Sequence, residues 1–259
     1  MKPRALQFEA LERPAGAHQG DGRVRPVSRA SLGSDPRSFD RFASDYDRYT
    51  ALERPALPRW LVDLTPPHGR RALDAGCGSG RSTLALVERF DEVVGVDISL
   101  PLIEIARASR PHPRVRYLLE DLMHVVDEEG FDLVYSSTVL HHLDDLDAGL
   151  RHLRELVAPG GTAVLIDNIA AVPTPSRWVY RLGALRFVPL DVRRHGWGKA
   201  RWLFGFRTSG PWLDHLASDR YLSRRSFEHR YGAVFPDARF RALGFAHALI
   251  WRNPRPLAL

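Results

Sequence analysis

Hydrophobic residues recur at two spacings along this chain, and the alternation of these spacings predicts its elements. Short apolar runs rich in β-branched residues and leucine predict strands over 71–73, 92–99, 115–121, 131–137 and 161–169. Apolar residues three and four positions apart predict helices between them, over 82–90, 101–109 and 146–157. Because strands and helices alternate, we expect an α/β fold with a mostly parallel sheet covered by helices on both faces.

Other patterns precede this core. Residues 1–37 lack apolar periodicity, so we expect a disordered or loosely attached extension there. A second helix is predicted over 53–64, after an aromatic stripe at helical spacing that opens the core region 38–169. The stripe consists of Phe39, Phe42, Tyr46 and Tyr49. We expect these helices to form a lid over the sheet.

Residues 170–222 interrupt the alternation with a long stretch rich in arginine and tryptophan. A segment of this length without strands is more typical of a functional insertion than of a connection, so we expect a cap inserted after the fifth strand. Its aromatic side chains suit an aromatic or apolar acceptor, and they equally suit a core of the cap itself. Residues 223–259 are expected to complete the core with a helix over 223–235 and two strands that pair as a hairpin.

The net charge of +6 is unevenly distributed. Residues 177–259 hold 16 basic and 5 acidic side chains, a balance that could attract nucleic acid, anionic lipid or an acidic small molecule. Only Lys2 and Lys199 are lysines, so a GC-rich coding bias explains the arginine excess equally well. No apolar run is long enough to span a bilayer and no signal-peptide core is evident, which predicts a cytoplasmic protein without stable membrane insertion.

A glycine-rich turn, LDAGCGSG at 73–80, carries the candidate chemistry. Its glycines allow backbone amides to approach a ligand, and Asp97 at the end of the next strand can accept both hydroxyls of a ribose. The spacing is G-x-G-x-G rather than the G-x-G-x-x-G of dinucleotide sites. A buried Asp74 would repel a pyrophosphate but suit a ligand with an ammonium and a sulfonium. The turn therefore predicts S-adenosylmethionine as the cofactor, with Cys77 as a small filler of the loop.

Five motifs, in order, resemble those of a class I S-adenosylmethionine-dependent methyltransferase of the small-molecule, type 11-like group. They are LDAGCGSG, VVGVDIS, EDLMHV, FDLVYSSTVLHHLDD and PGGTAVLIDNI. The resemblance implies a Rossmann-like sheet of seven strands with an antiparallel C-terminal hairpin. It also implies cofactor contacts from Tyr46, Asp74, Gly76, Cys77, Gly78, Gly80, Asp97, Ile98, Asp121, Leu122 and Ser136. In this scheme Asp121 accepts the adenine amino group, and Ser136 lies by the methionine end of the cofactor.

Missing motifs narrow the choice of acceptor. The chain lacks the N-P-P-Y or D-P-P-Y motif of exocyclic-amine nucleic-acid methyltransferases, and its one cysteine already lies in the cofactor loop. We therefore expect a small-molecule acceptor and no nucleic-acid partner. Asp167 and Asn168 resemble the pair of magnesium-dependent catechol-type methyltransferases, but a serine stands where that family places an aspartate after the fourth strand. We expect no metal.

A histidine pair, His141 and His142, follows the fourth strand near the expected acceptor. His142 could take a proton from a hydroxyl at neutral pH, so both are candidate catalytic residues, although one ring is expected to pack locally. We expect methyl transfer to a small aromatic or apolar metabolite, with oxygen favoured as the acceptor atom and nitrogen or carbon open.

Two alternatives remain open. One is a prenylated quinone-like lipid acceptor, for which the apolar, arginine-containing segment 177–187 would rest on anionic lipid. The other is a non-catalytic module that binds S-adenosylmethionine. The sequence does not predict the acceptor's identity or the oligomeric state.

Overall fold

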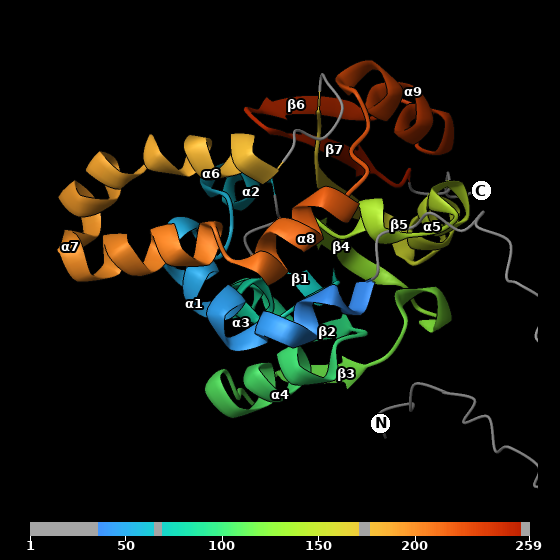
Figure 1. Cartoon of the computed structure of the whole chain (residues 1–259). Coiled ribbons are helices and arrows are strands. Elements are labelled where there is room, and N and C mark those ends of the chain that lie inside the picture. The colour runs from blue at the N-terminus through green and yellow to red at the C-terminus, as the bar shows by residue number, and fades with distance from the viewer. Residues whose placement is uncertain (1–35, 65–68, 171–176, 255–259) are drawn as a thin grey trace, which may run out of the picture.

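The computed structural model describes residues 36–64, 69–170 and 177–254 (Figure 1). The expected extension over 1–37 lies outside the described residues, apart from Pro36 and Arg37, which begin the first helical turn.

Seven strands form one sheet in the order β3-β2-β1-β4-β5-β7-β6. The strands are β1 Gly69–Ala75, β2 Phe90–Asp97, β3 Val115–Leu119, β4 Phe131–Ser137, β5 Val157–Asn168, β6 Arg239–Leu243 and β7 Ala246–Arg252. The first five strands are parallel, and β7 runs antiparallel to both β5 and β6. The expected fold class is confirmed. The strand order reverses between β1 and β4, which is where open α/β sheets bind their ligands.

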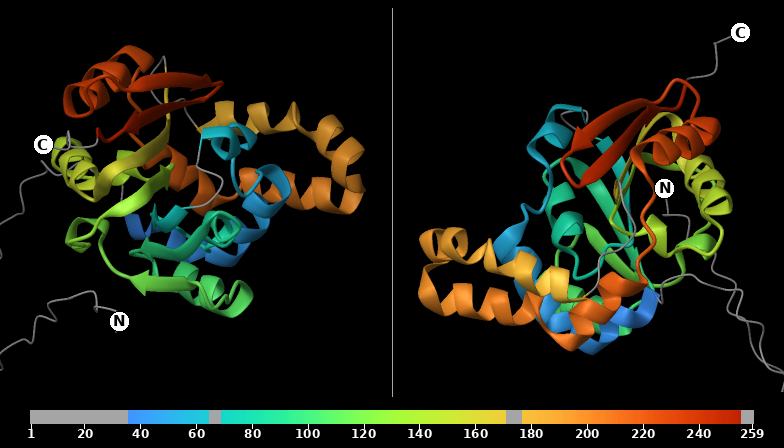
Figure 2. Two further views of the ribbon diagram at one scale, coloured as in Figure 1. Left: turned by 180° about the vertical axis from the view of Figure 1, so that it is seen from behind. Right: turned by 45° about the horizontal axis from the view of Figure 1, so that its top comes forward.

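Helices cover both faces of the sheet (Figure 2). On one face, Leu61 and Leu86 pack with Phe90; on the other, Leu150 and Phe227 are buried in a second cluster. The helices of the core are η1 Pro36–Phe42, α1 Ala43–Glu53, α2 Arg59–Leu64, α3 Arg81–Leu86, α4 Leu100–Ser109, η2 Leu122–His124, η3 Leu140–His142, α5 Leu146–Glu155 and α9 Arg224–Val234.

Proline and capping residues set several of these boundaries. The helix expected over 53–64 is interrupted, because Pro55 and Pro58 separate the end of α1 from the start of α2. The Ser99 side chain accepts a hydrogen bond from the Leu102 backbone N–H at the start of α4. Because β1 is parallel to both β2 and β4, the carboxyl ends of these three strands lie at the same edge of the sheet.

Three helices fill the described part of the expected cap, namely α6 Arg177–Leu185, α7 Val188–Arg207 and α8 Gly210–Ser218. Residues 177–207, here called the helical arm, stand away from the sheet in every view (Figures 1 and 2). The arm turns back at Gly196, whose φ of 79° breaks α7. No helix within the described ranges is long and apolar enough to cross a membrane.

Candidate active site

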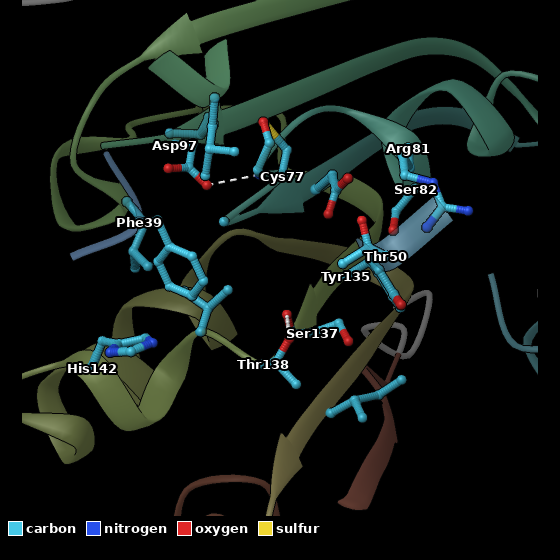
Figure 3. Close-up of a pocket in the computed structure, with 18 of the residues that line it drawn as sticks. Phe39, Thr50, Cys77, Arg81, Ser82, Asp97, Tyr135, Ser137, Thr138 and His142 are labelled. Atoms are coloured by element: carbon cyan, nitrogen blue, oxygen red, sulfur yellow. Dashed lines mark hydrogen bonds between the residues drawn. The ribbon is translucent and has the colours of Figure 1, made fainter. Parts of the chain in front are cut away.

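A cavity of about 770 Å³ opens at the carboxyl ends of β1, β2 and β4. Figure 3 shows Asp97 and Phe39 toward one end of it and Arg81, Ser82 and Tyr135 toward the other. A volume of this order is typical of a small-ligand site.

The glycine loop forms the floor of this cavity. Its backbone is pressed onto the neighbouring strand, because the N–H groups of Gly76 and Cys77 donate to the Val96 carbonyl at 2.8 and 2.9 Å. Gly76 has a φ of +78°, and a Cβ there would lie 2.2 Å from Val139 Cγ2. Only glycine therefore fits at this position. Burial raises the pKa of the Cys77 thiol well above its ordinary value, as suits a packing role.

Asp97 lies at the end of β2 with its carboxylate toward the cavity (Figure 3). It accepts hydrogen bonds from the backbone N–H groups of Gly78 at 2.7 Å and Ser99 at 2.9 Å. A Cβ built on Gly78 would meet nothing closer than 4.0 Å. A ligand can therefore approach the loop and the carboxylate together, as a ribose would require.

Asp74 supplies a second buried carboxylate to the cavity. Thr83 Oγ1 donates to its Oδ2 at 2.7 Å. Burial raises the pKa of Asp74 to about 7. A cationic ligand would favour the ionised form of this side chain, so the site fits an ammonium or a sulfonium.

Of the other residues expected to bind the cofactor, most line the cavity and Gly80 does not. Tyr46, Ile98, Asp121 and Leu122 line the cavity, and the Asp121 carboxylate accepts from the Met123 N–H at 2.9 Å. Gly80 is absent from the described lining; it is the N-cap of α3 with a φ of +80° and lies against the Tyr117 ring.

Ser136 does not line the cavity, contrary to the expectation that it lies by the methionine end of the cofactor. Its side chain is fully buried, and its hydroxyl donates to the Ala75 carbonyl at 2.8 Å. Successive side chains of a strand point to opposite faces, and it is Ser137 and Thr138 that line the cavity beyond β4.

Two aspartates hold the lid over the loop, and sequence reasoning missed both. Asp40 accepts from Ser99 Oγ at 2.5 Å. Asp47 accepts from Ser79 Oγ at 2.6 Å and from the Arg110 guanidinium at 2.8 Å. Their sequence spacing of one heptad beside the aromatic stripe is the signal that could have revealed them.

The two candidate catalytic histidines occupy different environments. His142 lines the cavity, and burial, helped by its neighbours His141 and His215, lowers its pKa to about 2. His141 lies outside the described lining, with Nδ1 2.6 Å from Asp167 Oδ1. Burial opposes protonation of His141, yet the carboxylate of Asp167 raises its pKa overall. A general base must reach the acceptor and works best with a pKa near the operating pH. The low pKa of His142 disfavours that role, and His141 does not line the cavity.

The described part of the cap does not reach the cavity, contrary to the expectation that the cap carries acceptor specificity. None of the described residues over 177–222 lines it. Phe206 and Trp212 instead bury Phe42 of the lid, with Trp202 and Tyr49 packed around them. These cap aromatics therefore serve packing between cap and lid, whereas Trp178 and Trp197 are exposed.

Further side chains outside the cap line the cavity, and sequence reasoning did not single them out. They are Arg54, Trp60, Arg81, Tyr135, Leu243 and Phe245. They come from the α1–α2 connection, α2, the start of α3, β4, the end of β6 and the β6–β7 turn, so no single motif could reveal them.

Comparisons with known proteins agree with this geometry. Residues 73–165 match the family model described as methyltransferase domain. An uncharacterized methyltransferase of Mycobacterium tuberculosis is 29% identical over 203 residues, which cover 75% of this chain and 93% of that protein. A malonyl-[acyl-carrier protein] O-methyltransferase of Salmonella typhimurium is 36% identical over 125 residues, covering 48% of this chain and 49% of the relative. A trans-aconitate 2-methyltransferase of Methylobacterium radiotolerans is 41% identical over 143 residues, covering 54% and 52%. The chain thus spans about half the length of these last two relatives.

Solved structures show the same fold. The complex of DhpI with SAH superposes with a TM-score of 0.57 at 19% identity and covers 89% of this chain and all of that one (100%). A putative S-adenosyl-L-methionine-dependent methyltransferase from Methanococcus maripaludis superposes with a TM-score of 0.56 at 12% identity, covering 94% of this chain.

Proposed function

This chain is a class I S-adenosylmethionine-dependent methyltransferase, and we propose that it methylates an anionic oxygen of a small aromatic or apolar metabolite. The acceptor group that we favour is a carboxylate. When bound, the cofactor supplies a methyl group carried on a sulfonium. The observation that carries the proposal is the cavity lining, which combines the guanidiniums of Arg54 and Arg81 with apolar and aromatic side chains.

The two arginines form a positive patch that suits an anion. Arg81 Nη2 donates to the Arg54 carbonyl at 3.0 Å, which ties the glycine loop to the end of α1. Burial lowers the pKa of Arg81, and the positive charge of Arg110 adds to this effect. A guanidinium in such surroundings gains from a carboxylate, which it can bind with two parallel hydrogen bonds.

The apolar and aromatic side chains of the cavity lining suit an acceptor whose remaining part is apolar. Trp60 and Leu243 are packed against the buried sheet face, and Tyr135 and Phe245 complete the lining. An acceptor that is already an anion needs alignment with the methyl group but no base. This accords with the low pKa of His142 and with the position of His141 outside the described lining. Malonyl and trans-aconitate, the acceptors named for two relatives, are acids as well.

The cofactor carries a carboxylate of its own, so we expect one arginine to bind the cofactor and the other to bind the acceptor. Arg81 adjoins the glycine loop and would bind the cofactor, whereas Arg54 comes from the lid and would bind the acceptor. Loss of a hydrogen bond to a charged group costs about 1.5–3 kcal/mol. Arg54→Gln should therefore raise the acceptor KM by about ten- to a hundredfold while the cofactor Kd stays unchanged.

This experiment needs an acceptor, which mass spectrometry can find by screening acids, amines and neutral phenols for a gain of one methyl group. Arg59→Gln is the matched control, because Arg59 is exposed on α2 outside the described lining. Equal effects of Arg54→Gln on the acceptor KM and the cofactor Kd would contradict this division. A screen in which only amines or neutral phenols react would contradict the acid acceptor.

The quinone-like lipid acceptor is a second candidate, favoured by one observation. The helical arm exposes Trp178 and Leu182 to solvent next to exposed arginines. An acceptor dissolved in a bilayer would explain such a surface. The named relatives are enzymes, and nothing in the site favours the non-catalytic module.

A further inference from the structure

Two histidines and an aspartate converge beside the cavity. One ligand atom from each of His141, His142 and Asp219 lies within 4.8 Å of the other two. His141 Nε2 lies 3.9 Å from Asp219 Oδ1, and these two side chains are only 5% and 0% exposed. Asp219 follows α8 of the cap, whereas both histidines lie on η3 of the core.

The groups around this cluster resemble the outer shell of a metal site. His141 Nδ1 lies 2.6 Å from Asp167 Oδ1, and histidines that bind metals commonly donate their other ring N–H to a carboxylate. Asp219 also accepts from the Tyr221 hydroxyl. His215 Nε2 lies 3.5 Å from Asp219 Oδ2 and could supply a fourth ligand.

We propose that His141, His142 and Asp219 bind a zinc-type divalent transition-metal ion, with His215 as the fourth ligand. Imidazole nitrogens and a carboxylate are donors that Zn²⁺ accepts. Bonds of about 2 Å place tetrahedral ligands about 3.4 Å apart, so ligand atoms that lie within 4.8 Å of one another would move closer on binding.

The proposed ion replaces the expectation of no metal and gives the two histidines a different role. It would join Asp219 of the cap to the core next to the cavity, because His142 also lines that cavity. The two buried carboxylates, Asp167 and Asp219, would gain a counter-charge. This inference does not rest on the identity of the acceptor.

The test is a titration of the chelator-treated full chain with Co²⁺, followed by visible absorption. We expect one equivalent to bind with the d–d bands of a four-coordinate nitrogen and oxygen site, and a displacement of Co²⁺ by Zn²⁺. Asp219→Asn and His142→Ala should each abolish the bands, whereas His124→Ala should keep them, because His124 is exposed on η2.

Two results would overturn the metal site. One is wild-type protein that binds no stoichiometric Co²⁺ or Zn²⁺, in which case the contact between His141 and Asp167 accounts for the arrangement of the cluster. The other is Co²⁺ bands that survive in both variants. The wild-type titration decides the question even if a variant fails to fold.

The helical arm carries a second, independent inference. Trp178 and Trp197 are 64% and 75% exposed, and Leu182 is 56% exposed. On α6 the positions of Trp178, Leu182 and Leu185 share one helix face. A projecting element with this much exposed apolar surface is typical of an interaction site.

The charge of the helical arm indicates an anionic partner. Seven basic side chains of the arm are exposed: Arg177, Arg181, Arg186, Arg193, Arg194, Lys199 and Arg201. The one acidic residue over 177–207 is Asp191, which is buried and accepts a hydrogen bond from Arg207. This balance would repel a second copy of the arm and attract anionic lipid, while the exposed tryptophans and leucines suit the interface of a bilayer.

We infer that the arm docks the protein on an anionic membrane surface. Full-length protein should cosediment with phosphatidylcholine vesicles that contain phosphatidylglycerol, and only weakly with vesicles of phosphatidylcholine alone. Trp197→Ala and Leu182→Ala should reduce the bound fraction several-fold, whereas Leu119→Ala, an exposed leucine on β3, should not. Raising the salt concentration should also weaken binding.

Three outcomes would contradict this docking. They are equal binding to both kinds of vesicle, binding that tolerates Trp197→Ala and Leu182→Ala, and concentration-dependent dimerisation or DNA binding in place of vesicle binding. None of them depends on turnover, so they leave the proposed function untouched.

Discussion

Asp97 is the single residue on which the cofactor site depends most. Its carboxylate is fixed by the N–H groups of Gly78 and Ser99 and still faces the cavity. Removing two charge-assisted hydrogen bonds to a ribose should weaken binding by about 2 kcal/mol or more. Calorimetry on Asp97→Ala checks this, with the melting temperature as a control for folding. Unchanged affinity would contradict the site.

Asp74 should make cofactor binding depend on pH. Burial raises its pKa to about 7, so the carboxyl group is mostly neutral below that pH and becomes an anion as the pH rises. A cationic ligand binds the anion, so affinity should increase by up to about tenfold per pH unit between pH 5.5 and 7. Binding near pH 6.5 should release a proton.

Calorimetry in two buffers of different ionisation enthalpy measures that release. Asp74→Asn removes the titrating group, so the variant should bind more weakly and with a flatter pH profile. A steep profile that persists in Asp74→Asn would assign the effect to another group, and a wild-type affinity that falls over this range would contradict the argument.

The glycine loop and Asp97 could be predicted from the sequence because each depends on local spacing along one strand–turn–helix unit. Ser136 was misplaced by one position, since strand register decides which of Ser136 and Ser137 faces the cavity. The roles of Arg54 and Tyr135 could not be predicted, because long-range packing alone brings the α1–α2 connection and β4 together.

At the scale of elements, polar contacts help to hold the lid over the glycine loop, and Asp47 makes two of them. It accepts from Ser79 at 2.6 Å and from Arg110 at 2.8 Å. Asp47→Ala should loosen α1 over the loop, so the cofactor should dissociate several-fold faster with little change in global stability. Stopped-flow fluorescence measures the rate.

Asp45→Ala is the matched control for this variant, because Asp45 lies on the same helix with its side chain exposed. Equal dissociation rates for Asp47→Ala and wild-type protein would show that the lid does not retain the cofactor.

The cap illustrates a limit of composition as a guide to elements. Its tryptophans and arginines predicted an acceptor lining, yet the described cap buries Trp212 and Phe206 against the lid and presents Trp178 and Trp197 outward. The sequence contains the same residues in either arrangement. The choice depends on which surface of α8 meets η1, and that is a tertiary contact.

At the scale of the whole molecule, the parallel sheet and its antiparallel end followed from the order of apolar segments and from family resemblance. The direction of the helical arm did not, because the break at Gly196 depends on one φ angle in an otherwise helical pattern. The cavity itself combines side chains from the lid, the glycine loop, several strands and the β6–β7 turn, so it emerges only from the complete fold.

The central claim is methyl transfer to an acid, and the chemical form of the product tests it most directly. Full-length protein is incubated with S-adenosylmethionine labelled in its methyl group and with an acceptor found by screening, and the isolated product is then treated with mild alkali. A methyl ester hydrolyses and releases labelled methanol, whereas a methyl ether or a methylamine keeps its label. We predict that the label is released as volatile methanol. Label that remains on the product through this treatment would contradict the account.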